Sequence, residues 1–218
     1  MVYTPSKCGL NNLGWAPNFF IPSVDLMVGL LDANSWMADI DLGEMFLNFP
    51  LDPKVRPLVG VDLTPYFGDD NKPLWERWCR CLMGFKPSPY NACCSFLWGE
   101  EIIRGTPRDT SLPFQYERIV LNMPGEKDYN PGKPWLMKTR EDGRIASDVI
   151  TYVDDLRTIG ASEKLCQEVT HRVASVVNYL GMQDAPRKRR PASQTPGAWA
   201  GSLVTTNSEG VYVSVSQE

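Results

Sequence analysis

The chain has 218 residues, enough for a full hydrophobic core at the usual ~100–200 residues per domain. Its composition, 43% apolar and 22% charged, is that of an ordinary globular protein, and the net charge of −4 argues against a protein that simply coats nucleic acid. No stretch approaches the roughly 18 apolar residues of a membrane span, and the N-terminus lacks a charged-then-apolar signal pattern, so we expect an intracellular protein, cytoplasmic or nuclear, with no membrane partner.

The first elements expected along the chain are a short helix and an acidic strand. Ser23 is a good N-cap for a helix over residues 24–31. Residues 37–42 then alternate apolar and acidic side chains, which is typical of a strand and places Asp39 and Asp41 on one face.

The middle of the chain predicts a strand pair, a helix and an irregular segment. Residues 59–63 and 74–81 alternate like paired strands, with a turn-rich stretch between them. Residues 88–103 read as a helix. The segment 104–144 is richer in Pro, Gly and charge than a core needs, and its end, 138–144, predicts a hairpin with Asp-Gly at the turn.

Two adjacent carboxylates stand in the next predicted hairpin. The apolar, β-branched stretches 146–151 and 156–159 frame Tyr152-Val153-Asp154-Asp155. Folding disfavours neighbouring like charges, and a divalent cation such as Mg²⁺ would remove the repulsion. A chance acidic turn is the alternative.

The C-terminal part predicts a second helix and completes the fold class. Residues 162–180 carry an apolar stripe that stops at Gly181. Strands and helices interleave without a regular βαβ alternation, so the fold class is α+β. We expect an antiparallel sheet that bears the acidic residues, backed on one face by the helices 88–103 and 162–180.

The six cysteines do not predict a metal site. Cys79-x-Cys81, expected on one face of a strand, and Cys93-Cys94 lack zinc-site spacing, and His171 has no partner cluster in the sequence. We interpret the cysteines as packing thiols and the histidine as a surface or partly packed residue.

Several segments resemble, in order, the motifs of reverse transcriptases. Asp41, Phe46 and Pro50-Leu51 resemble the first catalytic motif, whose register leaves Asp39 as a strand neighbour and not a metal ligand. Tyr152 to Asp155 resembles the third motif. The remaining similarities lie in residues 82–89 (a Gly-x-x-x-Ser-Pro turn), the basic run 187–190 and residues 198–204.

The resemblance implies an RNA-directed DNA polymerase that adds nucleotides to a primer 3′ hydroxyl with two metal ions, Mg²⁺ or alternatively Mn²⁺. Its partners would be an RNA or DNA template with primer and deoxynucleoside triphosphates. The residues it implies are Asp41, Asp154 and Asp155 for catalysis and metal binding, Phe46, Met83, Gly84, Ser88 and Lys188 for the nucleotide, and Trp199, Ala200 and Gly201 for gripping the primer.

Two of these residues keep alternatives open. Phe46 would exclude a 2′ hydroxyl and favour DNA as product, but it could also be a core aromatic. Lys188 is one choice among four basic residues at 187–190, and the run could instead be a solvated charge cluster or a nuclear localisation signal.

The resemblance covers roughly residues 5–215 and implies one reverse transcriptase domain over 1–218. Within it we expect a partial fingers remnant at 1–35, a palm core at 36–206 and an insertion at 104–144, with no thumb, as in a piece of a retrotransposon or retrovirus-like polyprotein. A catalytically inactive remnant that binds nucleic acid or a protein is the alternative function.

Overall fold

The computed structural model describes residues 5–68, 72–106, 109, 111–114, 116–131, 133, 135–146 and 148–216. By its internal contacts the chain forms two compact units, made from the described parts of Met1–Phe19 with Glu44–Leu97 and of Phe20–Gly43 with Trp98–Glu218. This division cuts across the segments 1–35 and 36–206 expected from sequence, whose bounds stay predictions.

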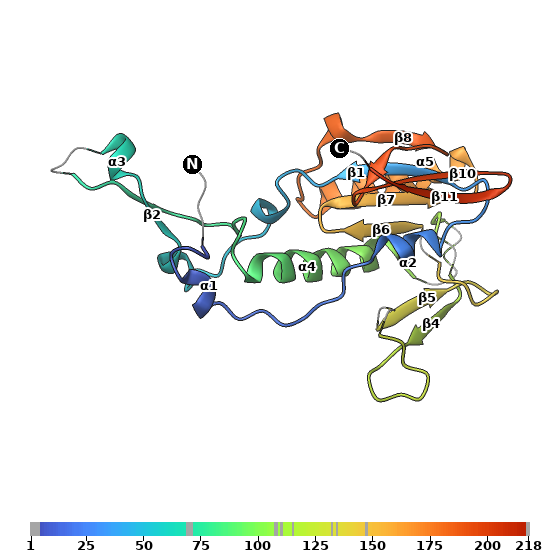
Figure 1. Cartoon of the computed structure of the whole chain (residues 1–218), viewed down its shortest axis with the longest axis horizontal. Coiled ribbons are helices and arrows are strands. Elements are labelled where there is room, and N and C mark those ends of the chain that lie inside the picture. The colour runs from blue at the N-terminus through green and yellow to red at the C-terminus, as the bar shows by residue number, and fades with distance from the viewer. Residues whose placement is uncertain are drawn as a thin grey trace. The chain divides into compact units, whose positions relative to one another are not determined.

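The larger unit is built on a four-stranded antiparallel sheet with the order β6-β7-β1-β8 (Figure 1). Its strands are β6 (Val149–Tyr152), β7 (Asp155–Gly160), β1 (Trp36–Asp41) and β8 (Arg190–Ser193). Strand β1, the acidic strand expected from sequence, is therefore central and borders β7 directly.

Helix α5 (Glu163–Tyr179) covers one face of this sheet, as its apolar stripe predicts. Ser162 caps it by accepting a hydrogen bond from the backbone N–H of Leu165. On the inner side, the Thr158 hydroxyl of β7 lies 2.7 Å from the Thr170 hydroxyl of α5. Because side chains alternate along a strand, Asp155 and Arg157 point to the opposite face.

The last turns of α4 (Pro87–Arg104) belong to the same unit and lie beside β6 and α5. Arg104 donates to the Val149 carbonyl of β6 (2.9 Å), and Arg172 of α5 donates to the Ile102 carbonyl (3.0 Å). The two helices predicted behind the sheet are both present in the structure.

The opposite face of the sheet is covered by α2 (Val24–Val28) and by a three-stranded sheet with the order β11-β10-β9. The strands are β9 (Ala198–Trp199), β10 (Ser202–Asn207) and β11 (Gly210–Val215). Their common core contains the buried side chains Met27, Leu31, Met37, Ile150, Ile159, Trp199 and Val204.

The predicted insertion carries a two-stranded ribbon, β4 (Arg118–Leu121) with β5 (Leu136–Thr139). The expected Asp-Gly turn is present, with Gly143 at a left-handed φ of 81° and a bridge from Thr139 to Ile145. The main partner of β5 is nevertheless β4. The apolar run Ile119 to Leu121 of β4 favours a strand, but it lies in a segment whose Pro, Gly and charged residues predict irregular structure.

The smaller unit contains short elements around a compact core. They are α1 (Leu10–Leu13), the 3₁₀ turns η1 (Met45–Asn48) and η2 (Arg56–Leu58), β2 (Gly60–Asp62) paired with β3 (Trp75–Arg77), α3 (Thr64–Phe67) and the start of α4. The buried cluster is Leu10, Leu51, Val59, Cys81, Leu82 and Phe85.

The predicted strand pair of this unit is present but shorter than expected. Because β3 ends at Arg77, Cys79 and Cys81 lie outside it, and Cys79 is exposed while Cys81 is buried. The expectation that these two cysteines share one face of a strand is wrong. Within the described part of the chain, no helix has the length and apolar character needed to cross a bilayer.

Candidate functional site

Two carboxylates meet where the central strands of the larger unit end. Asp41, the last residue of β1, is the direct register partner of Asp155, the first residue of β7. Direct partners in an antiparallel pair point to the same face with Cβ atoms about 4.5–5.5 Å apart. The fold therefore brings together two carboxylates that are far apart in the sequence.

Asp154 lies beside this pair in the two-residue turn that joins β6 to β7. Its carbonyl accepts a hydrogen bond from the backbone N–H of Leu42 (3.0 Å), which ties the turn to the end of β1. Val153, the other turn residue, has a φ of 55°, a left-handed conformation that is costly for a β-branched side chain. The hairpin with an acidic tip predicted from sequence is thus present.

The Asp41 carboxylate is shielded from solvent, with its side chain only 12% exposed. Its Oδ2 accepts a hydrogen bond from Lys188 Nζ at 2.9 Å, whereas Oδ1 is buried without a hydrogen-bond partner among the described residues. Lys188 ends the 3₁₀ turn η3 (Pro186–Lys188), which is held there because the Ala185 N–H donates to the Asp41 carbonyl.

Burial raises the pKa of the Asp155 carboxyl above its ordinary value, and repulsion from Asp154 and then Asp41 raises it further. Only Lys188 acts in the opposite direction among the charges that contribute. The pair is therefore a point of stored electrostatic repulsion, which is characteristic of functional sites.

A divalent cation fits this arrangement by its chemistry. The unpartnered Asp41 Oδ1 and the repelled Asp155 carboxylate both gain from a nearby positive charge, and carboxylate oxygens are the ligands that Mg²⁺ prefers. Lys188 supplies such a charge to Asp41. In the described ranges, no three His, Cys, Asp or Glu side chains gather as a metal-binding group.

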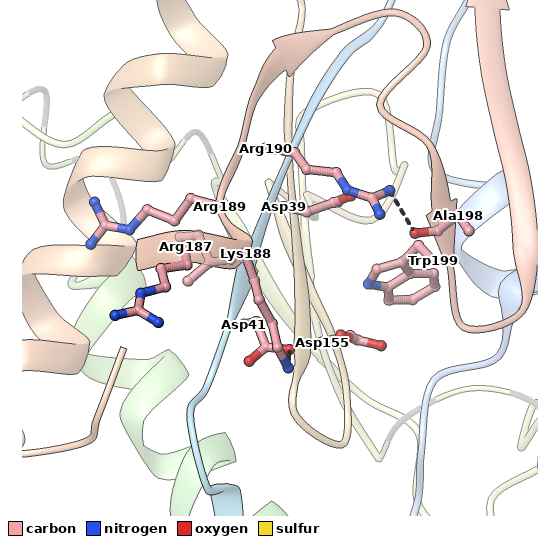
Figure 2. A pocket seen from close by; sticks show the side chains of 10 residues that line it. Asp39, Asp41, Asp155, Arg187, Lys188, Arg189, Arg190, Ala198 and Trp199 are labelled. Carbon is pink, nitrogen blue, oxygen red and sulfur yellow. Dashed lines mark hydrogen bonds and ion pairs between the residues drawn. The ribbon is translucent and has the colours of Figure 1, made fainter. Parts of the chain in front are cut away.

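These residues border a cavity of about 300 Å³ on the face of the sheet away from α5. Figure 2 shows Lys188 beside Asp41, with Asp155 and Trp199 further along the cavity. The residues that line it are Asp39, Ile40, Asp41, Asp155, Arg187, Lys188, Arg189, Arg190, Ala198 and Trp199.

The basic run at 187–190 contributes one residue to the carboxylates. Lys188 contacts Asp41, Arg189 pairs with Asp184, and Arg190 donates to the backbone carbonyls of Pro196 and Ala198 (both 3.1 Å). Lys188 is therefore the residue of this run with a described contact to the carboxylate pair. A contact to phosphate stays a prediction.

The segment expected to grip a primer forms a tight hairpin. Ala200 and Gly201 make the turn between β9 and β10, with left-handed φ values of 47° and 77°. Trp199 is almost fully buried, and its ring packs edge-on against Tyr152 at 6.0 Å between centroids.

The other four predicted nucleotide-binding residues belong to the smaller unit. Phe46, in η1, is half-buried against the cluster of that unit, so it has a packing role there. Met83 is 76% exposed, Gly84 has a φ of 80°, and Ser88 is fully buried in the first turn of α4. Their roles toward a nucleotide stay predictions.

Sequence reasoning missed Arg157, a charged residue in the middle of a buried strand. Its guanidinium is fully buried and binds Asp39 through two hydrogen bonds, of 2.7 and 2.9 Å. The signal was a lone arginine in an apolar strand, which demands a buried carboxylate partner. Asp39 is therefore committed to Arg157, in keeping with its interpretation as a strand neighbour of Asp41.

Comparison with known proteins gives a likeness in fold. No protein family model matches the chain, and no curated protein matches it. Among solved structures, a foamy viral protease–reverse transcriptase in complex with double-stranded DNA matches with a TM-score of 0.58 and 12% sequence identity. The match covers 92% of this chain and 26% of the other, so this chain spans about a quarter of that protein.

Proposed function

We propose that this chain is the palm-like catalytic part of an RNA-directed DNA polymerase from a retrovirus-like or retrotransposon element. The observation that carries the proposal is the direct pairing of Asp41 with Asp155 beside the Asp154 turn. The similarity in fold to a reverse transcriptase structure supports the same class of chemistry.

In this proposal Asp41, Asp154 and Asp155 hold two Mg²⁺ ions, or Mn²⁺ ions. Bound there, the ions would activate the primer 3′ hydroxyl and neutralise charge on the departing pyrophosphate. The chain's own contribution is to fix the carboxylates on two hydrogen-bonded strands, so that little reorganisation is needed during reaction.

Lys188 has a distinct role in this proposal. Its side chain is 66% exposed although its ammonium contacts the buried Asp41, so it can leave the carboxylate without a large rearrangement. Once cations occupy the carboxylates, the ammonium is free to bind the triphosphate of the incoming nucleotide.

The other predicted residues define substrates in the same proposal. Phe46 would lie against the sugar and select deoxynucleotides, and the turn with Met83, Gly84 and Ser88 would support the templating base pair. The β9–β10 hairpin, with its turn at Ala200-Gly201, would hold the primer end of an RNA or DNA template duplex.

A second function is favoured by two observations. Lys188 already neutralises Asp41, and the described residues contain no three-ligand metal group. A protein that retains this fold but binds nucleic acid or a protein partner without catalysis would be compatible with both facts.

Primer extension with Asp154→Asn decides between the two functions. This substitution removes a charge and little volume, so the fold should survive while extension of a primed RNA template falls by several orders of magnitude. The assay uses the protein as its gene encodes it, first with Mg²⁺ and then with Mn²⁺. Absence of extension by the parent protein, together with unaltered nucleic-acid binding in the variant, would support the non-catalytic function.

A further inference from the structure

A cluster of charged side chains next to the carboxylate pair joins the main sheet to the β9–β10 hairpin; in it Arg157 is buried, Asp39 is partly buried and Arg190 is exposed. Asp39 lies in the centre of β1, and its register partners on the two neighbouring strands are both arginines, Arg157 on β7 and Arg190 on β8. Two residues further along the same face of these strands stand Asp41 and Asp155.

The two arginines bind three consecutive backbone carbonyls that lead into the hairpin. Arg190 donates to the carbonyls of Pro196 and Ala198, each at 3.1 Å, and Arg157 donates to the Gly197 carbonyl between them at 3.2 Å. Figure 2 shows Arg190 reaching across the cavity to Ala198. The approach to the hairpin is thus bound by side chains of β7 and β8.

The Arg157 guanidinium also contacts Trp199, the aromatic residue of the hairpin. The Arg157 guanidinium carbon lies 5.5 Å from the centroid of the Trp199 ring, within the range of a cation–π interaction. Because Asp39 takes two of its N–H groups, the plane of the guanidinium is fixed. A lysine could not make the paired contact to Asp39 and the contact to Gly197 together.

Gly197 is adapted to this arrangement. Its φ is 102°, and a Cβ atom there would meet Arg190 Nη1 at 2.2 Å. The positive φ favours glycine at this position, and the absence of a side chain leaves room for the Arg190 guanidinium against the backbone.

We infer that Asp39, Arg157 and Arg190 form a clamp whose role is to position the β9–β10 hairpin relative to Asp155, and so to set the position of a bound primer end. The inference rests on the proposed function for the primer, whereas the hairpin itself can be followed independently. Arg157 is a positioning residue, because it acts through the hairpin and not on the reacting atoms.

Stability and positioning can be separated with a paired substitution. Arg157→Met alone leaves the Asp39 carboxylate buried without its partner and should strongly lower stability. In Asp39→Leu/Arg157→Met, the buried ion pair is replaced by apolar side chains, an exchange that is often neutral or stabilising. The double variant should therefore unfold near the parent's temperature but still lack the bond to Gly197.

The experiment measures thermal unfolding, amide hydrogen exchange of residues 198–203, and the KM and kcat of primer extension. We expect the amides of residues 198–203 to exchange about tenfold faster in the double variant, and its KM for primer–template to be about tenfold higher. A change of about tenfold corresponds to the loss of one charge-assisted hydrogen bond. Its kcat should change less. Arg157→Lys should raise the KM to the same extent, and it replaces the double variant in this experiment if the double variant does not fold.

Arg140→Met is the matched control. It removes the ion pair between Arg140 and Asp148 (3.1 Å), which is also partly buried but lies away from the hairpin, at the end of the predicted insertion next to β6. It should leave hairpin exchange and KM unchanged. Unchanged hairpin exchange in a folded double variant would overturn the clamp, as would faster exchange with unchanged KM in an active enzyme. If the parent extends no primer while hairpin exchange still rises, the clamp stands and the polymerase proposal fails.

Discussion

Asp41, the last residue of β1, and Asp155, the first residue of β7, are direct partners across an antiparallel strand pair. Like charges at such positions destabilise a sheet. Burial and the neighbouring carboxylates raise the pKa of Asp155, and Asp41 Oδ1 has no hydrogen-bond partner among the described residues. Folding gains nothing from the repulsion between these two carboxylates, which makes the pair a candidate functional site.

Asp155→Asn should stabilise the metal-free protein at neutral pH. The folded-state pKa of Asp155 is raised, so the parent loses stability as pH rises through that pKa, and the amide variant does not. We expect a gain of about 1 kcal/mol or less at pH 7, absent at acid pH, where the parent carboxyl already carries its proton. Thermal unfolding at pH 7 and at pH 3.5–4 (roughly the ordinary carboxyl range) measures it.

Added Mg²⁺ should make the parent protein more stable than the Asp155→Asn variant. The cation stabilises the parent by binding the folded carboxylates, and the variant offers one charge fewer. Glu168→Gln, an exposed change on α5, controls for net charge and should respond to Mg²⁺ as the parent does. Equal Mg²⁺ shifts in all three proteins would exclude a cation site at Asp155.

Lys188→Met should make the stability of the protein depend more strongly on Mg²⁺. Without the ammonium, the shielded Asp41 carboxylate loses its partner at 2.9 Å, which costs about 1–3 kcal/mol in a buried site. Added Mg²⁺ then fills that role without displacing a lysine. We therefore expect a lower unfolding temperature and a larger rise on adding Mg²⁺ than in the parent.

Arg187→Met is the control for this prediction, because Arg187 lines the same cavity. Differential scanning calorimetry with and without Mg²⁺ compares the two variants. Matching Mg²⁺ responses would show that Lys188 and the metal do not compete for Asp41.

The sequence predicts those parts of the fold that have a local pattern. The acidic hairpin and the helix α5 each follow from a few neighbouring residues, whereas the hairpin at 198–204 is implied only by the resemblance. The resemblance implies that the strands of Asp41 and Asp154 adjoin, and the structure shows that the direct partner of Asp41 is Asp155. Periodicity alone does not say which strands are neighbours.

The rest depends on contacts between distant segments. Asp39 and Arg157 are separated by more than half the chain, and the residues around each of them do not identify the other as its partner. The bonds from Arg157 and Arg190 to three carbonyls need the relative positions of β7, β8 and β9. The sequence does not predict strand β4 because it lies in a segment rich in Pro, Gly and charge, and because residues 122–135 separate it from its partner β5.

If the proposed polymerase function is correct and Phe46 excludes the 2′ hydroxyl, Phe46→Ala should admit ribonucleotides that the parent rejects. The side chain is also half-buried against the core of the smaller unit, so the change should cost about 2 kcal/mol of stability, less than for a fully buried Phe. Primer extension with each nucleotide type gives the ratio of kcat/KM values.

Phe49→Ala is matched to it, because Phe49 packs partly buried against the same cluster. It should lower stability comparably and leave nucleotide discrimination unchanged. The same discrimination in the parent and both variants would assign Phe46 to packing alone.

The ion pair between Glu101 and Lys138 should respond asymmetrically to substitution. Lys138 is 5% exposed and Glu101 is 53% exposed, with 2.7 Å between their charged atoms. Glu101→Ala leaves a buried ammonium whose remaining neighbours among the described residues include the Tyr116 ring, 5.0 Å away, and the Glu100 carboxyl. Since water can approach from the Glu101 side, we expect a loss of about 2 kcal/mol, below the 3–5 kcal/mol typical of a fully buried pair.

Lys138→Met removes the buried charge and leaves Glu101 largely hydrated, so it should cost about 1 kcal/mol or less. Glu101→Ala/Lys138→Met should then be more stable than Glu101→Ala alone, which is the signature of a stranded charge and not of lost packing. Urea unfolding of the three variants, with amide exchange of β4 and β5 to locate the change, tests this. A double variant less stable than either single one would mean that the two side chains act through packing.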